Sequence, residues 1–148
     1  MFSNTVFKNV IELRVHDVVP LEHEFFLRIA QAFPRLQRFY VTDLSLHSHN
    51  SKKSTDNVAS HQIVEYPHLT FFLDITRVDT NYVEQLLDET KTHLPSLTEL
   101  HVRYEDLRVV TEDLTRELTR RNCVKVTRLT TWREIVGSKD FYIYFPLL

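Results

Sequence analysis

A short apolar phrase recurs along the chain and constrains the fold more than any other feature. In its two clearest copies, residues 33–41 and 94–102, a proline precedes apolar residues at offsets 0, +3 and +5 from a leucine. A third copy, residues 66–75, has one additional residue, which we interpret as a bulge in a strand. Residues 10–15 and 126–131 form two further copies that lack the proline. A phrase of this kind predicts a chain built from repeating units.

The spacing of the phrases favours a solenoid. They begin at residues 10, 36, 69, 97 and 126, which gives intervals of 26, 33, 28 and 29 residues. Leucine-rich repeats have about 20–29 residues, with a strand and a helix in each unit. The one long interval contains a polar stretch, residues 47–57, which we interpret as a loop insertion. Five copies exceed the roughly three repeats that a continuous core requires.

The segments between the phrases have the apolar spacing of amphipathic helices. We predict helices at residues 21–32, 81–93 and 106–121, and a shorter one at residues 56–65. Asn81 with Glu84 resembles a capping box at the start of the second helix. Alternation of strands and helices predicts a parallel sheet with the helices on one side.

Two other interpretations compete with the repeat. Leucine and valine are common enough for the phrase to be a coincidence in an ordinary α/β domain. A doubly wound sheet would also alternate strands and helices, but its strands are buried on both faces and form continuous apolar runs. Here Glu12, Arg14 and His16 alternate with Leu13 and Val15, so one face of the sheet is expected to contact solvent.

We therefore expect an α/β fold, a short irregular leucine-rich-repeat solenoid of about five parallel strands with helices on the convex side. The repeat register places five apolar residues next to one another across the sheet: Leu13, Phe39, Leu73, Leu100 and Leu129. Irregularity is expected because the common repeat has Asn or Cys eight residues after its first leucine. The corresponding residues here are Val18, Leu44, Val78, Glu105 and Glu134.

Part of the chain resembles the C-terminal leucine-rich region of divergent invertebrate F-box-domain proteins. The resemblance is carried by YPHLTFFLDI (residues 66–75), DTNYVEQLLDETKTHLP (79–95), VRYEDL (102–107) and LTRELTRRNC (114–123). It implies a substrate-recognition role in a cullin-type ubiquitin ligase. The segment PLEHEFFLRI (20–29) is superficially similar to the start of an F-box, but it runs directly into the next repeat. A ubiquitin-ligase adaptor is therefore expected as a partner only if an F-box lies upstream in a longer product.

Composition argues against several functional classes. Gly137 is the only glycine, whereas phosphate-binding loops and nucleophile elbows require several. A net charge of −2 gives no electrostatic basis for binding nucleic acid or an anionic membrane. No apolar run approaches the roughly 20 residues that span a bilayer. Cys123 is the only cysteine, so an intracellular location, cytoplasmic or nuclear, is expected.

Few residues suggest chemistry. His47 and His49 are the only closely spaced histidines, and two imidazoles are too few for a closed zinc site. Cys123 is expected to be a buried structural thiol. The adjacent carboxylates at residues 88–89, 105–106 and 112–113 are expected to be solvated. We predict no catalytic, metal or cofactor-binding residues, the alternative being a small hydrolase or metal-dependent enzyme with an unrecognised site.

The strand pattern instead predicts a binding face. Because side chains alternate along a strand, the residues between the core positions point to the concave surface, which solenoids commonly use for binding. The expected partner-binding residues are Arg14, His16, Arg38, Tyr40, Phe72, Asp74, His101, Arg103, Arg128 and Trp132. The same pattern would also suit a polar exterior without a partner. We expect a non-catalytic protein-binding module for an unknown target, with the solenoid at residues 1–136 and a tail or cap at residues 137–148.

Overall fold

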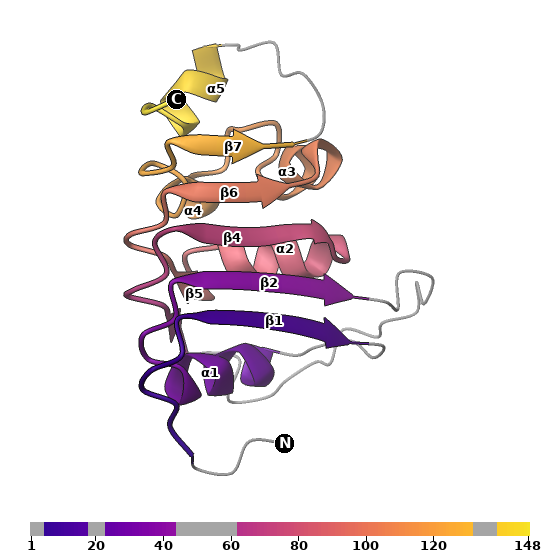
Figure 1. The fold of residues 1–148 in the computed structure, drawn as a ribbon. Helices are drawn as coiled ribbons and strands as arrows, with labels where there is room; N and C mark the ends of the chain where they lie inside the picture. The colour runs from indigo at the N-terminus through magenta and orange to yellow at the C-terminus, as the bar shows by residue number, and fades with distance from the viewer. Residues whose placement is uncertain (1–4, 18–22, 44–61, 132–138) are drawn as a thin grey trace.

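Five parallel strands form the main sheet, in the order in which they occur in the chain (Figure 1). The computed structural model describes residues 5–17, 23–43, 62–131 and 139–148. The strands of the main sheet are β1 (Glu12–Asp17), β2 (Arg38–Asp43), β4 (Phe72–Arg77), β6 (Glu99–Val102) and β7 (Arg128–Thr130). Two short parallel strands, β3 (Val64–Glu65) and β5 (Thr92–His93), pair separately. The described helices are α1 (His23–Ala32), α2 (Thr80–Leu87), α3 (Tyr104–Val110), α4 (Glu117–Arg120) and α5 (Lys139–Tyr144).

The register of the main sheet is the one that the repeats predict. Each apolar residue of the predicted row pairs with the next across the sheet, in the order Leu13, Phe39, Leu73, Leu100 and Leu129. The predicted α/β class, with five parallel strands, is therefore confirmed.

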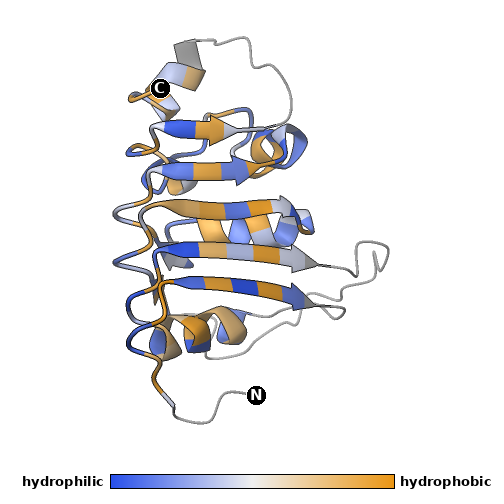
Figure 2. Ribbon diagram, viewed as in Figure 1, coloured by the Kyte–Doolittle hydropathy of each residue, from blue (hydrophilic) through white to orange (hydrophobic). Residues whose placement is uncertain are grey.

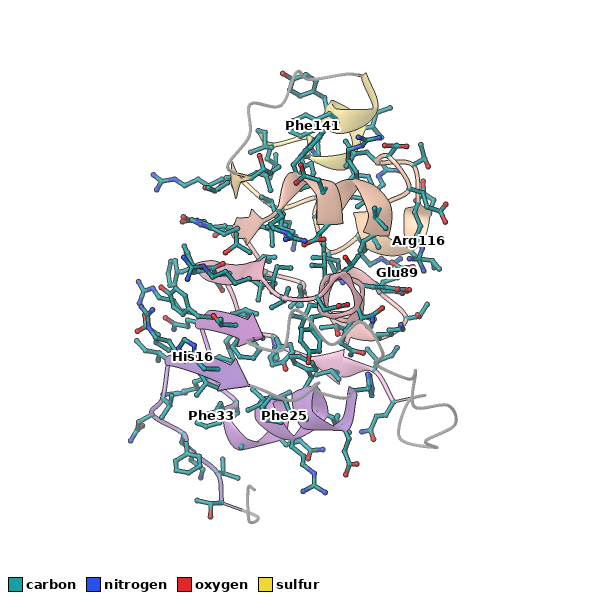
Figure 3. The ribbon with its side chains drawn as sticks, turned by 90° about the vertical axis from the view of Figure 1, so that its right-hand side faces the viewer. His16, Phe25, Phe33, Glu89, Arg116 and Phe141 are labelled. Carbon is teal, nitrogen blue, oxygen red and sulfur yellow. The ribbon has the colours of Figure 1, made fainter. Side chains whose placement is uncertain are left out.

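The core lies between the sheet and the helices. Apolar and polar residues alternate along β1 (Figure 2), as expected for a strand with one solvated face. Seen from the side, the strands form one layer and the helices α1 to α4 form the other (Figure 3). Phe39, Leu73 and Leu100 from the strands pack in the same buried cluster as Phe26 of α1 and Leu86 of α2.

Two predicted helices are wrong in their extent because short strands interrupt the helical periodicity. The helix expected at residues 81–93 ends at Leu87, and residues 92–93 form β5. Residues 64–65, at the end of another expected helix, pair with β5 as β3; residues 56–61 lie outside the described part of the chain. Asp79, not Asn81, caps α2, and its side chain accepts a hydrogen bond of 2.9 Å from the Asn81 backbone N–H.

The helix predicted at residues 106–121 is also wrong, because the chain forms two helices with a turn between them. Glu112, Asp113 and Leu114 have φ values of 51°, 58° and 66°, in the left-handed region that an α-helix excludes. The Thr111 hydroxyl stabilises this turn by donating to the Leu107 carbonyl and accepting from the Leu114 N–H at 3.0 Å. The apolar spacing is helical through the whole segment, but the backbone leaves the helical conformation at the turn of residues 112–114.

The additional residue of the third phrase, which we interpreted as a bulge in a strand, lies before the first paired residue of β4. Arg38 pairs with Phe72 and Phe39 with Leu73 in regular register. The irregularity in this strand pair comes later, after Tyr40. The additional residue is accommodated before β4, in a bend at Phe71.

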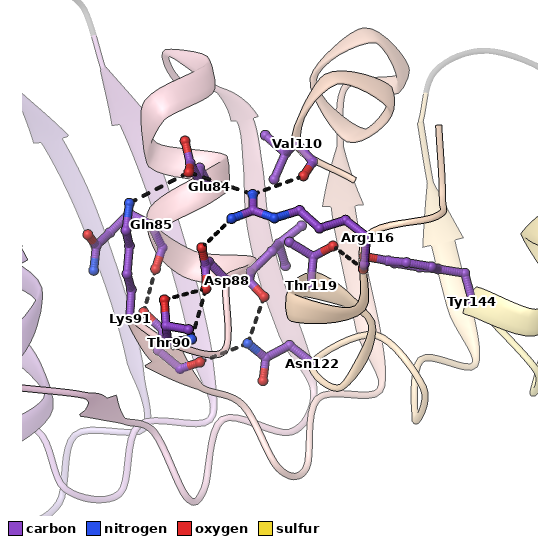
Figure 4. A network of polar contacts seen from close by, with 12 residues as sticks. Glu84, Gln85, Asp88, Thr90, Lys91, Val110, Arg116, Thr119, Asn122 and Tyr144 are labelled. Carbon is purple, nitrogen blue, oxygen red and sulfur yellow. Dashed lines mark hydrogen bonds and ion pairs between the residues drawn. The ribbon is translucent and has the colours of Figure 1, made fainter. Parts of the chain in front are cut away.

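A buried polar network joins α2 to α4 (Figure 4). The Arg116 guanidinium donates to the Asp88 carboxylate at 2.8 Å, and that carboxylate also accepts from the N–H and the hydroxyl of Thr90. The Asn122 amide donates to the Leu87 and Thr92 carbonyls and accepts from the backbone N–H of residue 94. Two of the adjacent carboxylates expected to be solvated, Asp88 and Asp106, are instead buried.

The C-terminal segment packs against the core near α4. Phe141, Tyr144 and Phe145 are buried in the main cluster, and the Tyr144 hydroxyl donates to the Arg116 carbonyl at 3.2 Å. Tyr142 and Ile143 of the same helix are exposed. Helix α5 therefore covers apolar side chains at the β7 end of the sheet (Figure 1).

Candidate binding surface

The face of the sheet opposite the helices carries the side chains that the sequence places on a binding face. His16 lies on the strand layer, whereas Glu89 and Arg116 lie on the helix layer (Figure 3). The pairing of Arg14 with Tyr40 and of Asp74 with His101 brings residues from neighbouring strands side by side on this face.

Four of these side chains stack in a continuous row, which we call the aromatic row. The Arg14 guanidinium lies 4.0 Å from the centroid of the Tyr40 ring. The Tyr40 and Phe72 centroids are 4.8 Å apart, and those of Phe72 and His101 are 4.2 Å apart. The row crosses β1, β2, β4 and β6, so each of four adjacent strands supplies one member. Stacked rings and a cation over a ring hold one another in place before any partner binds.

The acidic residues beside the aromatic row have partners within the protein. The Glu99 carboxylate lies 3.0 Å from His101 Nε2. Asp74 accepts hydrogen bonds from the Thr76 N–H at 3.0 Å and from its hydroxyl at 2.7 Å. These contacts fix the positions of the two carboxylates and partly satisfy them.

An open hollow of about 310 Å³ lies beside the aromatic row. Arginines from two strands flank it, an aromatic pair contributes to its wall, and the remaining lining is polar. The lining residues are Arg38, Phe71, Phe72, Thr98, Glu99, Thr127 and Arg128. Phe71 is 49% exposed, and the Arg38 guanidinium lies 5.4 Å from the centroid of its ring.

The predicted face residues differ in how freely they could contact a partner. Arg14, His16 and Arg128 are exposed, and Arg38, Tyr40, Phe72, Asp74 and His101 are partly buried. Arg103 is exposed, but its guanidinium forms two hydrogen bonds, of 3.0 and 3.1 Å, to the buried Asp106 carboxylate. That hydrogen bond is the main reason that the pKa of Arg103 is raised. Trp132 lies outside the described residues.

Sequence reasoning missed Phe71 as a surface residue. The available signal was the additional residue of the third phrase, which places one more side chain before β4 than the other repeats have. It also missed that Asp88 and Asp106 would be buried with arginine partners. The partner of Asp88, Arg116, lies 28 residues further along the chain, whereas Arg103 lies three residues before Asp106.

Cys123, a sequence candidate for chemistry, lies in the core and not on this surface. Cys123 is fully buried, and burial raises the pKa of its thiol, which disfavours the reactive thiolate. His47 and His49 lie outside the described residues. Within the described ranges there is no group of three or more His, Cys, Asp or Glu side chains placed to hold a metal ion. None of the helices in those ranges is long and apolar enough to cross a bilayer.

Comparison with known proteins gives no relative: no family model, no curated protein and no solved structure matches the chain.

Proposed function

We propose that this chain is a non-catalytic protein-binding module, an irregular leucine-rich-repeat-like solenoid that binds its target through the solvent-facing side of its main sheet. The observation that carries the proposal is the aromatic row. Aromatic and arginine side chains are enriched at the energetic centres of protein interfaces. A row with one member from each of four strands presents them as one rigid, continuous surface.

The architecture supports a solenoid because each strand pairs with those of the preceding and following repeats. The row of apolar residues at equivalent repeat positions lies in one register across the sheet. In such proteins each repeat contacts mainly its neighbours, and the strand face forms an extended binding surface.

The resemblance to F-box proteins suggests a more specific role, in which the bound protein is a target for ubiquitination. The adaptor would then bind an F-box in another part of a longer product. We place the module inside the cell, because its single cysteine is buried and could form no internal disulfide.

A capture experiment with the purified chain tests the binding function. Tyr40→Ala and Phe72→Ala remove two members of the aromatic row, and each should lower recovery of specific partners from an extract of the source organism. A true interface centre contributes about 2 kcal/mol or more, which corresponds to a loss of affinity of about thirtyfold.

Tyr142→Ala is the matched control, since Tyr142 is an exposed aromatic residue on α5. It should leave recovery unchanged. Thermal melting of each variant separates loss of binding from loss of folding. Equal recovery by wild type and by both folded row variants would show that this face is not the binding surface.

A further inference from the structure

Two arginines stand at opposite ends of the hollow beside the aromatic row. Arg38 on β2 pairs with Phe72 on β4, and Glu99 on β6 pairs with Arg128 on β7. Phe72 and Glu99 occupy neighbouring positions in the register that joins β4 to β6. The four residues therefore follow one line across four adjacent strands, with an arginine at each end.

The two guanidinium groups have charge available for a ligand. The acidic residue between them, Glu99, forms its ion pair with His101. Within the described part of the chain, neither Arg38 nor Arg128 forms an ion pair with an acidic side chain. Arg38 contacts the exposed Phe71 ring, which leaves the edge of its guanidinium free for further hydrogen bonds.

We propose that the hollow binds an extended acidic peptide with carboxylates at positions i and i+4 and an apolar side chain at i+2. One carboxylate contacts Arg38, the other contacts Arg128, and the apolar side chain packs on Phe71 and Phe72. The inference rests on the proposed binding function and names the chemistry of the bound segment.

The spacing follows from the geometry of strands. Arg38 and Arg128 are separated by three intervals between neighbouring strands of about 4.8 Å each, or roughly 14 Å. An extended peptide rises by about 3.3 Å per residue, so four residues span about 13 Å. Residues i, i+2 and i+4 of an extended chain also point to the same side, toward the sheet.

The charges of Arg38, Glu99 and Arg128 determine which residue types the peptide should have at positions i, i+2 and i+4. Arginine and carboxylate form charge-assisted hydrogen bonds that can be bidentate, which favours an acidic residue at each end. Glu99 lies between the arginines and would repel a third carboxylate, so the middle position favours an apolar residue. A nucleic acid would place regularly spaced phosphates over Glu99 as well, and the chain carries a net charge of −2.

Selection from a phage-displayed library of random peptides about twelve residues long tests this proposal on the full chain. Enriched peptides should share the acidic, any, apolar, any, acidic pattern. Arg38→Gln together with Arg128→Gln should weaken binding of an enriched peptide by about tenfold or more, the loss expected for one or two charge-assisted hydrogen bonds. Arg28→Gln, the same change on α1, should leave binding unchanged.

Charge reversal sharpens the test. Arg38→Glu together with Arg128→Glu should shift the selected residues at the two outer positions from acidic to basic, a gain of function that a misfolded variant would not show. Thermal melting checks that both double variants fold.

Three results would overturn the proposal. Enriched peptides that lack the spaced acids but depend on Tyr40 would overturn the acidic pattern while leaving the proposed binding function in place. Peptides with acids at any spacing, displaced equally well by heparin, would indicate a general polyanion-binding surface. No enrichment at all would exclude a short peptide as the ligand, and capture with the Tyr40→Ala variant would decide the binding function separately.

Discussion

Arg116 forms an ion pair with Asp88, a carboxylate whose position at the end of α2 would otherwise be unfavourable. Asp88 is the C-terminal cap of α2, where the helix dipole disfavours a negative charge, and its side chain is almost completely buried. Arg116 supplies the nearest positive charge, at 2.8 Å, and its Nη1 lies 3.6 Å from Glu84 on the same helix. Arg116 thus forms ion pairs with both acidic groups at the end of α2, and Lys91, whose Nζ lies 3.7 Å from Glu84, supplies a second positive charge.

Arg116→Met tests this dependence. The substitution removes the charge but keeps most of the aliphatic length, and it leaves Asp88 buried without its cation. We expect a loss of about 2–3 kcal/mol in the free energy of unfolding, below the upper range for buried pairs because Arg116 is partly exposed. Arg120→Met, which removes an exposed ion pair with Glu117, should cost less than about 1 kcal/mol. Urea denaturation of both variants measures the difference, and equal losses would contradict a special role for Arg116.

At the scale of elements, the strands were predictable and the helix ends were not. The strand phrase combines alternation with recurrence of the same apolar positions, and these positions predicted the register of the sheet. The segment containing Leu107, Val110, Leu114 and Leu118 has helical apolar spacing, yet it turns at residues 112–114. The spacing of apolar residues indicates which side chains could share one face of a helix. It does not predict the positive φ values at residues 112–114, because none of these residues is a glycine.

That turn makes a prediction about backbone conformation. Glu112 is exposed and has a φ of 51°, a conformation that costs a residue with a Cβ about 1–2 kcal/mol and costs glycine little. Part of this gain is offset because glycine loses more conformational entropy on folding than glutamate does. The net effect of Glu112→Gly should be a stabilisation of about 0.5–1 kcal/mol.

Val109→Gly is the comparison, because Val109 is exposed within α3, where glycine should destabilise by about 0.5 kcal/mol. Opposite shifts in melting temperature are expected for substitutions only three residues apart. A destabilising effect of Glu112→Gly would show that the segment does not adopt the left-handed turn in solution.

At the scale of the whole molecule, alternation along the strands was enough to place Arg14, Tyr40 and Phe72 on the solvent-facing side. It could not predict that these side chains stack, because stacking depends on the rotamers of neighbours that lie about 30 residues apart in the sequence. The hollow was also beyond prediction, since Phe71 enters it through an irregular bend. The repeat pattern of the sequence therefore predicts which face of the sheet is available for binding. The contacts among the side chains on that face become known only from the packing of the strands in the structure.

The pairing of the strands also predicts how stability varies across the sheet. Leu100 is fully buried between Leu73 and Leu129, whereas Leu13 occupies the equivalent position on the edge strand β1 and is only partly buried. Leu100→Ala removes atoms that are packed on every side, so we expect a loss of about 2–5 kcal/mol. Leu13→Ala removes the same atoms from a site with one flanking strand in the sheet, and its loss should be smaller by about 1 kcal/mol or more.

Equilibrium urea unfolding of both variants measures the two losses, with unchanged m-values confirming that the same cooperative unit unfolds. A loss below about 1 kcal/mol for Leu100→Ala would remove this residue from the core, and equal losses at the two sites would contradict the dependence on flanking strands.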